Sequence, residues 1–136
     1  MNDGYMDRIL VVDLSTGLVT KEELSEQTKK EYLGGMGLAT NILYNEMKPG
    51  TDALAPGNLI IFATGPLSGT TAPSAGRTDI TAKSPLTGGF GSANAGGFFA
   101  PQLKYAGYDA LVVKGKAPRP VYLWIDDDKV EILDAS

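Results

Sequence analysis

Short apolar runs separated by turn residues predict most of the strands in this chain. Residues 8–14 are apolar at four central positions, and residues 18–23 follow after a turn at 15–17, which predicts a hairpin. Residues 59–64 are almost wholly apolar and lie between Pro-Gly and Gly-Pro pairs, which is typical of a strand buried on both faces. Further strands are expected over residues 77–83, 88–93, 110–114, 121–126 and 129–133.

Two helices are expected between the hairpin and the buried strand. Residues 25–33 are polar and rich in helix formers, and Thr28 with Glu31 three residues later predicts a capping box. Apolar residues then repeat at helical spacing from Leu38 to Met47. Gly34 and Gly35 lie between the two patterns, so the sequence predicts two helices that meet at a glycine joint.

A third helix and the order of the elements indicate the fold class. Residues 96–105 predict the start of a helix, in which Pro101 is tolerable only if it lies in the first turn. Hairpin strands with two or three interspersed helices favour an α+β domain with an antiparallel-rich β-sheet over a doubly wound parallel sheet. No closing element follows the last strand, so we expect residues 1–136 to be one domain truncated from a longer protein.

Composition excludes several kinds of chemistry. The 136 residues contain neither cysteine nor histidine, which removes disulfides, Cys or His metal ligands, thiol nucleophiles and imidazole bases. A net charge of −4 offers no broad basic face, so no nucleic-acid partner is expected. Residues 1–8 are polar and lead into only a short apolar run, which predicts no leader, no membrane association and a cytoplasmic location.

Small residues are concentrated in one stretch. Residues 65–97 hold eight of the 17 glycines, and small side chains let a backbone approach a flat polar ligand closely. Arg77 supplies a planar guanidinium that suits a phosphate, and Asn94 supplies an amide. The alternative is structural: the glycines form turns and bulges, Arg77 pairs with Asp79 or another carboxylate, and Asn94 caps a helix. The residues alone leave both interpretations open.

Known nucleotide-binding motifs are absent from this stretch and from the helix joint. The motif of Gly35 and Gly37 follows a polar helical segment where a dinucleotide site requires a strand. The motif of Gly89 and Gly91 has Asn94 at its last glycine position, and the sequence holds no glycine-lysine-hydroxyl triplet of a P-loop. The glycine-rich stretch therefore belongs to neither class.

Seven ordered blocks cover almost the whole chain. They are VDLSTG (12–17), LGGMGL (33–38), GPLSGT (65–70), APSAGR (72–77), KSPLTG (83–88), ANAGG (93–97) and LKYAGYDA (103–110). Together they resemble the N-terminal domain of the tungsten-containing aldehyde ferredoxin oxidoreductase family. The family's proteins are several times longer, so the resemblance implies that residues 1–136 are the tungstopterin-binding part of a longer enzyme.

The resemblance also implies a cofactor and the residues that contact it. In the family, β-sheets of this domain carry a tungsten-bis(molybdopterin) cofactor. Arg77 matches an arginine between a pterin phosphate and a [4Fe-4S] cluster, whose cysteine ligands belong to other domains. Asn94 matches an asparagine at the pterin phosphates, close to Mg2+, and is the candidate metal residue. Ala95, Gly96 and Gly97 border the same cofactor.

The complete enzyme implied by this resemblance oxidises aldehydes to carboxylic acids and passes the electrons to ferredoxin, with a homo-oligomer as one possible assembly. No catalytic acid or base is assigned within this chain, and the isolated chain is expected to be inactive. Two alternatives remain open. One is a stand-alone, non-catalytic module that binds a pterin or phosphate ligand, and the other is a superfamily member that acts on a non-aldehyde substrate.

Overall fold

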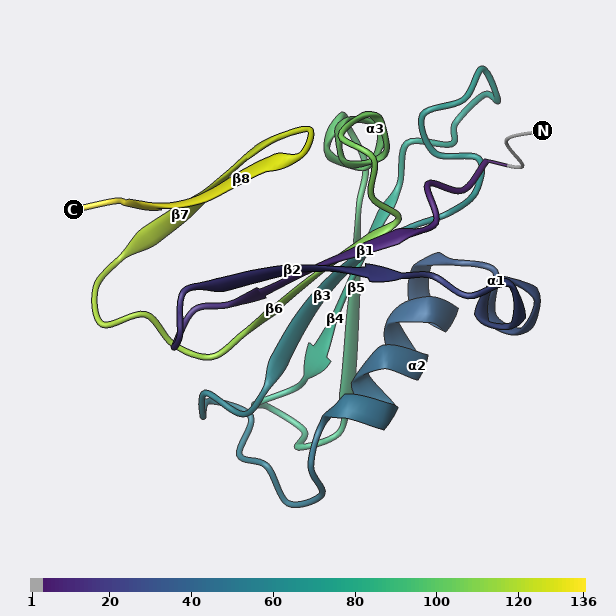
Figure 1. The fold of residues 1–136 in the computed structure, drawn as a ribbon. Coiled ribbons are helices and arrows are strands. Elements are labelled where there is room, and N and C mark those ends of the chain that lie inside the picture. The colour runs from purple at the N-terminus through teal and green to yellow at the C-terminus, as the bar shows by residue number, and fades with distance from the viewer. Residues whose placement is uncertain (1–3) are drawn as a thin grey trace.

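A six-stranded sheet, a separate hairpin and three helices make up the described part of the chain (Figure 1). The structure is a computed structural model that describes residues 4–136. Residues 1–3 belong to the N-terminal stretch for which no leader is predicted, and they lie outside the described residues. The elements are β1 (Arg8–Asp13), β2 (Leu18–Glu23), α1 (Glu26–Tyr32), α2 (Gly35–Glu46), β3 (Leu59–Thr64), β4 (Thr78–Lys83), β5 (Phe90–Ala95), α3 (Phe99–Tyr105), β6 (Ala110–Lys114), β7 (Val121–Asp126) and β8 (Lys129–Asp134).

The sheet has the strand order β2-β1-β6-β3-β4-β5, and β7 pairs with β8 alone. Neighbouring strands are antiparallel, except that β1 and β6 are parallel. The prediction of an antiparallel-rich α+β domain is therefore confirmed. The parallel pair lies inside the sheet, where β1 and β6 are largely buried and covered on both sides.

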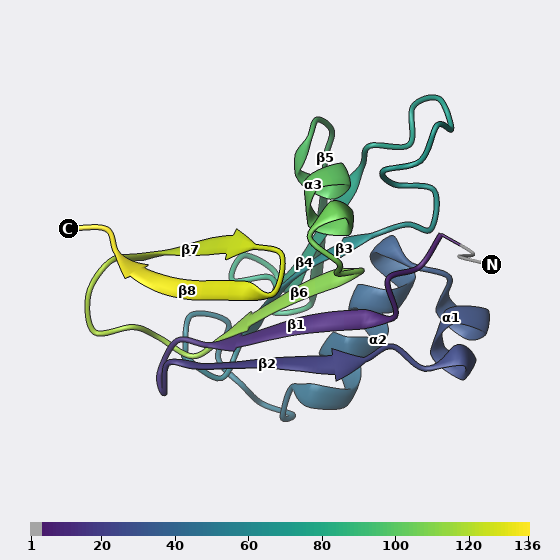
Figure 2. The same ribbon diagram turned by 45° about the horizontal axis from the view of Figure 1, so that its top comes forward.

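The helix α2 covers one face of the sheet. Its side chains Leu38 and Ile42 are buried against Ile61 of β3 and Val112 of β6, because apolar residues recur on the α2 surface that faces the sheet. α1 lies beside α2 at the same side of the sheet (Figure 2). This packing fixes the beginning of α2 close to the end of β3.

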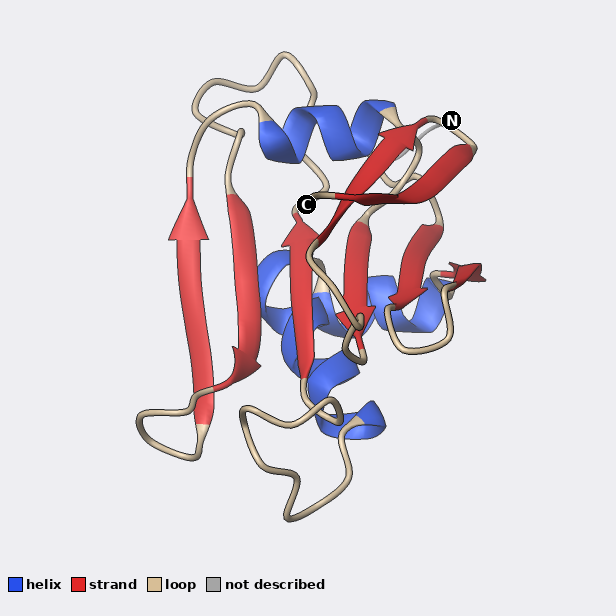
Figure 3. Cartoon of the chain, turned by 90° about the vertical axis from the view of Figure 1, so that its left-hand side faces the viewer, coloured by secondary structure: helices blue, strands red, loops and turns tan. Residues whose placement is uncertain are grey.

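The opposite face carries α3 and the β7–β8 hairpin. Leu10 and Leu111 of the sheet form a second core with Leu103 of α3, and Leu123 and Ile132 of the hairpin pack against it. Figure 3 shows the hairpin in front of the β1 and β6 side of the sheet, while β4 and β5 are not covered by it. The β4–β5 edge is therefore the part of the sheet that is open on this face.

Salt bridges and a tyrosine attach the turn of the hairpin to the sheet. Tyr108 is fully buried and donates its hydroxyl hydrogen to the Asp127 carbonyl at 3.0 Å. Arg8 and Lys21 form ion pairs with Asp128, and the hydrogen bond from Lys21 lowers the pKa of that carboxyl. The ion pairs of Asp128 therefore stabilise the fold fully at pH values above the ordinary carboxyl pKa of about 4. This stabilisation disappears as the pH falls through the lowered pKa of Asp128.

Three sequence predictions need correction at element boundaries. The capping box is wrong: Ser25 caps α1 by accepting from the Thr28 backbone N–H, since Thr28 already lies inside the helix. The strand expected at 88–93 begins at Phe90, because Gly88 forms the turn that precedes β5. α3 begins at Phe99 and not at residue 96, and Pro101 is indeed in its first turn.

The strand over residues 59–64 forms as expected but is not buried along its whole length. Ile60 of β3 is 40% exposed, although Ile61 and Ala63 are fully buried. No helix within residues 4–136 combines the length and apolar character needed to span a bilayer.

Candidate functional site

Three glycine-rich segments meet at one end of the sheet. Thr64 at the end of β3 pairs with Thr78 at the start of β4, and Thr78 pairs with Ala95 at the end of β5. The residues immediately beyond this row are Gly65, Arg77 and Gly96, which explains why stretches distant in sequence form one site. These strand ends lie at the top of Figure 3, beside the long loop that joins β3 to β4.

A cleft of about 460 Å³ opens at this end of the sheet. Arg77 and Asn94 both line it, so the structure brings these two candidate residues together. Ala95, Gly96 and Gly97 are exposed and continue directly from Asn94, but they are not part of the cleft lining. The lining residues are Gly35, Met36, Gly65, Pro66, Leu67, Ser68, Pro73, Ser74, Ala75, Arg77, Asp79 and Asn94.

Arg77 is available to an external ligand. Its side chain is exposed, and the ion pairs formed within residues 4–136 do not include Arg77 or Asp79. The alternative in which Arg77 pairs with Asp79 is therefore not observed. A guanidinium without an internal carboxylate partner suits a bidentate contact with a phosphate group.

Asp79 is a cleft residue whose importance was not predicted from the sequence. It is 5% exposed, and its carboxylate accepts hydrogen bonds from the side chains of Thr81 (2.6 Å), Ser92 (2.8 Å) and Asn94 (2.9 Å). Asn94 is thus a residue of β5 and not a helix cap; the N-cap of α3 is Phe98. The signal available in the sequence was a carboxylate among the threonine, isoleucine and alanine residues of the strand TDITAK.

Two glycines at the strand ends are not explained by the packing of the chain itself. A Cβ added to Gly65 or Gly96 meets no atom within 4 Å, and neither residue has a positive φ. Gly97 differs, because its φ of +109° by itself favours glycine. The open space beside Gly65 and Gly96 leaves the backbone accessible from outside the chain.

One wall of the cleft is formed by the beginning of α2, here called the α2 wall. It depends on a close approach between Gly34 and the backbone at the end of β3. A Cβ at Gly34 would lie 2.6 Å from the Thr64 carbonyl oxygen and 3.1 Å from Gly65 Cα. Glycine at position 34 therefore allows the beginning of α2, with Gly35 and Met36, to contact the end of β3. The predicted glycine joint between α1 and α2 is confirmed.

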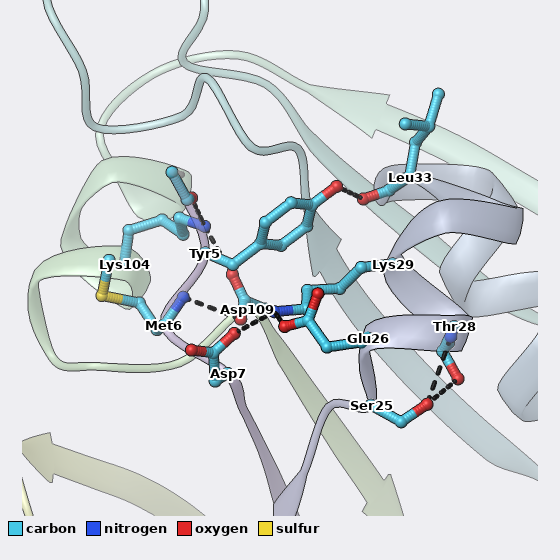
Figure 4. Close-up of polar contacts among 11 residues, drawn as sticks. Tyr5, Met6, Asp7, Ser25, Glu26, Thr28, Lys29, Leu33, Lys104 and Asp109 are labelled. Atoms are coloured by element: carbon cyan, nitrogen blue, oxygen red, sulfur yellow. Dashed lines mark hydrogen bonds and ion pairs between the residues drawn. The ribbon is translucent and has the colours of Figure 1, made fainter. Parts of the chain in front are cut away.

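The N-terminal segment, residues 4–7, holds the α2 wall in place (Figure 4). Tyr5 donates its hydroxyl hydrogen to the Leu33 carbonyl at 2.6 Å, directly before the glycine joint. Gly4 lies so close to the Pro66 backbone that a side chain at position 4 has no room. The segment therefore contacts both the α2 wall and the β3–β4 loop.

We expect Gly34→Ala to lower the free energy of unfolding by about 1–3 kcal/mol, since the added methyl overlaps backbone atoms that cannot move freely. Gly65→Ala is the matched control from the same cleft, and we expect it to change stability by less than about 0.5 kcal/mol because its methyl enters open space. Urea unfolding followed by circular dichroism measures both. Equal stability of the two variants would show that the α2 wall does not need the close approach.

Residues 9–136 match the family described as "Aldehyde ferredoxin oxidoreductase, N-terminal domain". The chain belongs to the aldehyde ferredoxin oxidoreductase family. The predicted resemblance is thereby confirmed, and it extends over nearly the whole chain.

Proteins named as tungsten-containing aldehyde ferredoxin oxidoreductases are similar to this member of the family. The one from Pyrococcus furiosus is 51% identical over 133 residues, and the one from Pyrococcus horikoshii is 50% identical over the same length. Each alignment covers 98% of this chain and 22% of the relative. The chain thus spans about a fifth of the length of these curated relatives.

Two further similar proteins are named for other substrates. An "Aliphatic sulfonate oxidoreductase, WOR-like subunit" of Pyrococcus furiosus is 40% identical over 136 residues, covering 98% of this chain and 22% of that protein. The solved structure "Active site complex BamBC of Benzoyl Coenzyme A reductase in complex with 1,5 Dienoyl-CoA" superimposes with a TM-score of 0.95 at 42% identity, covering 97% of this chain and 20% of that one. The aldehyde ferredoxin oxidoreductase domain fold is therefore shared by proteins named for different substrates.

Proposed function

We propose that residues 1–136 are the N-terminal cofactor-binding domain of a longer oxidoreductase that holds a tungsten-bis(molybdopterin) cofactor. The complete enzyme oxidises aldehydes to carboxylic acids and uses ferredoxin as electron acceptor. The observation that carries this proposal is the meeting of Arg77, Asn94 and Gly96 at one sheet end, beside a cleft in which Arg77 forms no ion pair with any of residues 4–136. The relatives named as tungsten-containing aldehyde ferredoxin oxidoreductases are about 50% identical to this chain, and their names support the tungsten cofactor and the aldehyde substrate.

The residues of the cleft and of the adjoining end of β5 fit a flat ligand that carries phosphate. Arg77 provides a positive charge, and the space beside Gly65 and Gly96 lets the backbone approach the ligand. The Asn94 amide nitrogen is used by Asp79, which leaves the amide oxygen for a hard cation such as Mg2+. No group of three or more acidic side chains is placed to hold a metal within the described residues, so Mg2+ would take its remaining ligands from phosphate and water.

The cofactor, when bound, supplies the two-electron chemistry of aldehyde oxidation, and the residues of this chain bind and orient it. Arg77 opposes phosphate charge, Asn94 and the following Ala95 contact the pterin and Mg2+ region, and Gly96 and Gly97 keep side-chain bulk away. The chain has no cysteine, so the ligands of a [4Fe-4S] cluster come from other domains. A cytoplasmic location, contact with ferredoxin and assembly into a homo-oligomer belong to the same proposal.

The first test is tungsten and pterin analysis of the longest natural product of the gene that carries this chain, here called the complete enzyme. We expect Arg77→Ala to reduce tungsten and pterin per enzyme, or the rate of electron transfer to ferredoxin, by about tenfold or more, since a desolvated charged contact is removed. Arg119→Ala is the matched control, because Arg119 is exposed and pairs with Asp134 at the β7–β8 hairpin. Unchanged tungsten, pterin and turnover in Arg77→Ala would refute the assignment of Arg77.

A non-aldehyde substrate is the second candidate function. It is favoured by the relative named for aliphatic sulfonates and by the structural neighbour named for benzoyl coenzyme A, which share this domain. Assays of the complete enzyme with aldehydes and a viologen dye separate the two candidates. Viologen reduction with aldehydes supports the first, whereas full cofactor content without aldehyde turnover supports the second.

The reading frame downstream of Ser136 distinguishes the proposed enzyme from a stand-alone module that binds a pterin or a phosphate ligand. A downstream C-x-x-C segment in the same frame supports the enzyme, and a stop codon directly after Ser136 supports the module.

A further inference from the structure

The loop between β3 and β4, residues 65–77, supplies most of the residues that line the cleft and ends at Arg77. Hydrogen bonds inside this loop are local, for example the one from the Ser68 N–H to the Gly65 carbonyl at 3.1 Å. Such turns bend the chain but do not place it relative to the sheet. The position of this part of the cleft therefore depends on the element that the loop packs against.

One face of α3 packs against this loop, and Figure 3 shows the helix beside it at the top of the view. Lys104 and Tyr105 follow Pro101 by three and four positions, so the three residues lie on one side of the helix. Leu103 instead is buried in the core between α3 and the sheet. The core therefore fixes α3, and the face of Pro101, Lys104 and Tyr105 is available to hold the loop.

Two contacts of this face lie near the beginning and the end of the loop. The buried Lys104 ammonium donates to the Gly4 carbonyl at 2.6 Å, and Gly4 lies against the Pro66 backbone. Near the end of the loop, a Cβ at Gly76 would lie 3.7 Å from Pro101 Cγ, so the chain passes close to α3 here as well. Packing thus places both ends of the loop.

The middle of the loop is held by Tyr105. Its hydroxyl donates to the Gly69 carbonyl at 3.1 Å, and within residues 4–136 this is the one hydrogen bond that joins residues 66–76 to another element of the fold. A Cβ at Gly69 would lie 3.2 Å from Tyr105 Cε1, so the ring and the loop backbone are also in close contact. Because Tyr105 is 64% exposed, its contribution to the core is small and its contacts serve the loop.

We propose that Tyr105 is a positioning residue for the cofactor, because through the Gly69 carbonyl it holds the β3–β4 loop in the place that forms one side of the cleft. The inference rests on the proposed function, since the ligand beside this loop is the phosphate-bearing cofactor. Tyr105 does not line the cleft and therefore acts through the loop. A loop that is already in place when the ligand binds loses less conformational entropy, and the ligand is retained longer.

The test compares two tyrosine variants of the complete enzyme that undergo the same chemical change. Tyr105→Phe removes the hydroxyl that donates to the Gly69 carbonyl, and Tyr108→Phe removes the one that donates to the Asp127 carbonyl at the β7–β8 turn. The two hydrogen bonds have lengths of 3.1 Å and 3.0 Å, and both rings are retained. Each enzyme is incubated in buffer without cofactor, and the tungsten and pterin that remain bound are measured over time.

We expect Tyr105→Phe to lose tungsten and pterin about two- to tenfold faster than the unmodified enzyme, which corresponds to the free energy of one hydrogen bond. Amide hydrogen exchange at Ser68 and Thr70 should increase by a similar factor, because these amides bond within the loop and report its opening. Tyr108→Phe should change neither rate. Equal cofactor loss from Tyr105→Phe and from the unmodified enzyme would overturn the proposal.

The stability of the two variants separates positioning from a general structural role. Tyr108 is fully buried, whereas Tyr105 is exposed, so the urea concentration at which the enzyme unfolds should fall more in Tyr108→Phe. Under a general structural role, cofactor loss would follow stability and would be faster in Tyr108→Phe than in Tyr105→Phe. That order of the two rates would also overturn the proposal.

A second pair of variants tests the same contact from the side of the loop. Gly69→Ala and Gly17→Ala each add a methyl group to a residue with positive φ, +78° and +74°, so the backbone strain is matched. The methyl group at position 69 lies against the Tyr105 ring, whereas the one at position 17 meets no atom within 4 Å. We expect faster cofactor loss and faster loop exchange in Gly69→Ala alone. Equal effects of the two substitutions would contradict the role of this contact.

Failure of this inference is distinguishable from failure of the proposed function. A complete enzyme that carries neither tungsten nor pterin refutes the proposed function. An enzyme that carries both, and in which Tyr105→Phe retains them as long as the unmodified enzyme does, refutes only the positioning role of Tyr105.

Discussion

Replacing Lys104 by methionine is expected to lower the free energy of unfolding by about 3–5 kcal/mol, the range found when one partner of a buried ion pair is removed. Lys104 is 3% exposed and Asp109 is 1% exposed, and the Lys104 ammonium lies 2.5 Å from Asp109 Oδ1. The same ammonium donates to the Gly4 carbonyl at 2.6 Å, while the Met6 backbone N–H donates to Asp109 Oδ2 at 2.9 Å. Methionine preserves most of the volume but leaves the Asp109 carboxylate buried without its cation.

Lys29→Met is the matched control for this prediction. The ammonium of Lys29 also lies near the Tyr5 ring, at 5.3 Å from its centroid compared with 5.5 Å for Lys104. Its acidic partners Asp7 and Glu26 are exposed, so water solvates them after the substitution. Urea unfolding of both variants followed by circular dichroism should therefore show a much larger loss for Lys104→Met, and equal losses would contradict the importance of burial.

A double variant separates the unpaired charge from the lost contact. Lys104→Met combined with Asp109→Leu removes both charges, and we expect it to be more stable than Lys104→Met alone, because no carboxylate remains buried. The double variant could instead lose as much free energy of unfolding as the two single variants lose together. That result would contradict this explanation and indicate that packing around the N-terminal segment dominates.

The strands were predictable from local pattern, and the contacts that build the cleft were not. β1, β3 and β6 follow from apolar runs bounded by turn residues, and β2 follows from the turn at 15–17, so all four depend on neighbours in sequence. The Lys104 contact with Gly4 joins residues 100 positions apart, and no periodicity reports such a pair. Local pattern also misplaced the start of β5, because the turn at Gly88 depends on hydrogen bonds with Ser84.

The candidate site was predictable in part. Arg77 and Asn94 were identified by their side-chain chemistry and by resemblance, and the structure shows why they meet: β4 begins where β5 ends. Asp79 had been considered only as a partner of Arg77, whereas it faces Asn94 in the strand register. Sequence alone gives the residue types near a site, but strand pairing decides which donor faces which acceptor.

The second large effect is expected at Tyr108, where Tyr108→Ala should lower the free energy of unfolding by about 3–5 kcal/mol, as for other buried aromatic side chains. The ring is fully buried in the core between the sheet and the β7–β8 hairpin, and its hydroxyl reaches the Asp127 carbonyl. Tyr108→Phe keeps the ring and removes this one hydrogen bond, so we expect a loss of about 0.5–1.5 kcal/mol. Urea unfolding measures both losses.

Amide hydrogen exchange shows whether Tyr108 attaches the β7–β8 hairpin to the sheet or only stabilises the core. We expect Tyr108→Ala to increase exchange in β7 and β8 more than in β1 and β6, because the hairpin pairs with no strand of the main sheet. Asp128→Asn is the control: Asp128 is 76% exposed in its ion pairs with Arg8 and Lys21, so its loss should increase hairpin exchange far less. Equal protection of the hairpin in Tyr108→Ala and the unmodified chain would mean that the apolar contacts of Leu123 and Ile132 alone hold it to the sheet.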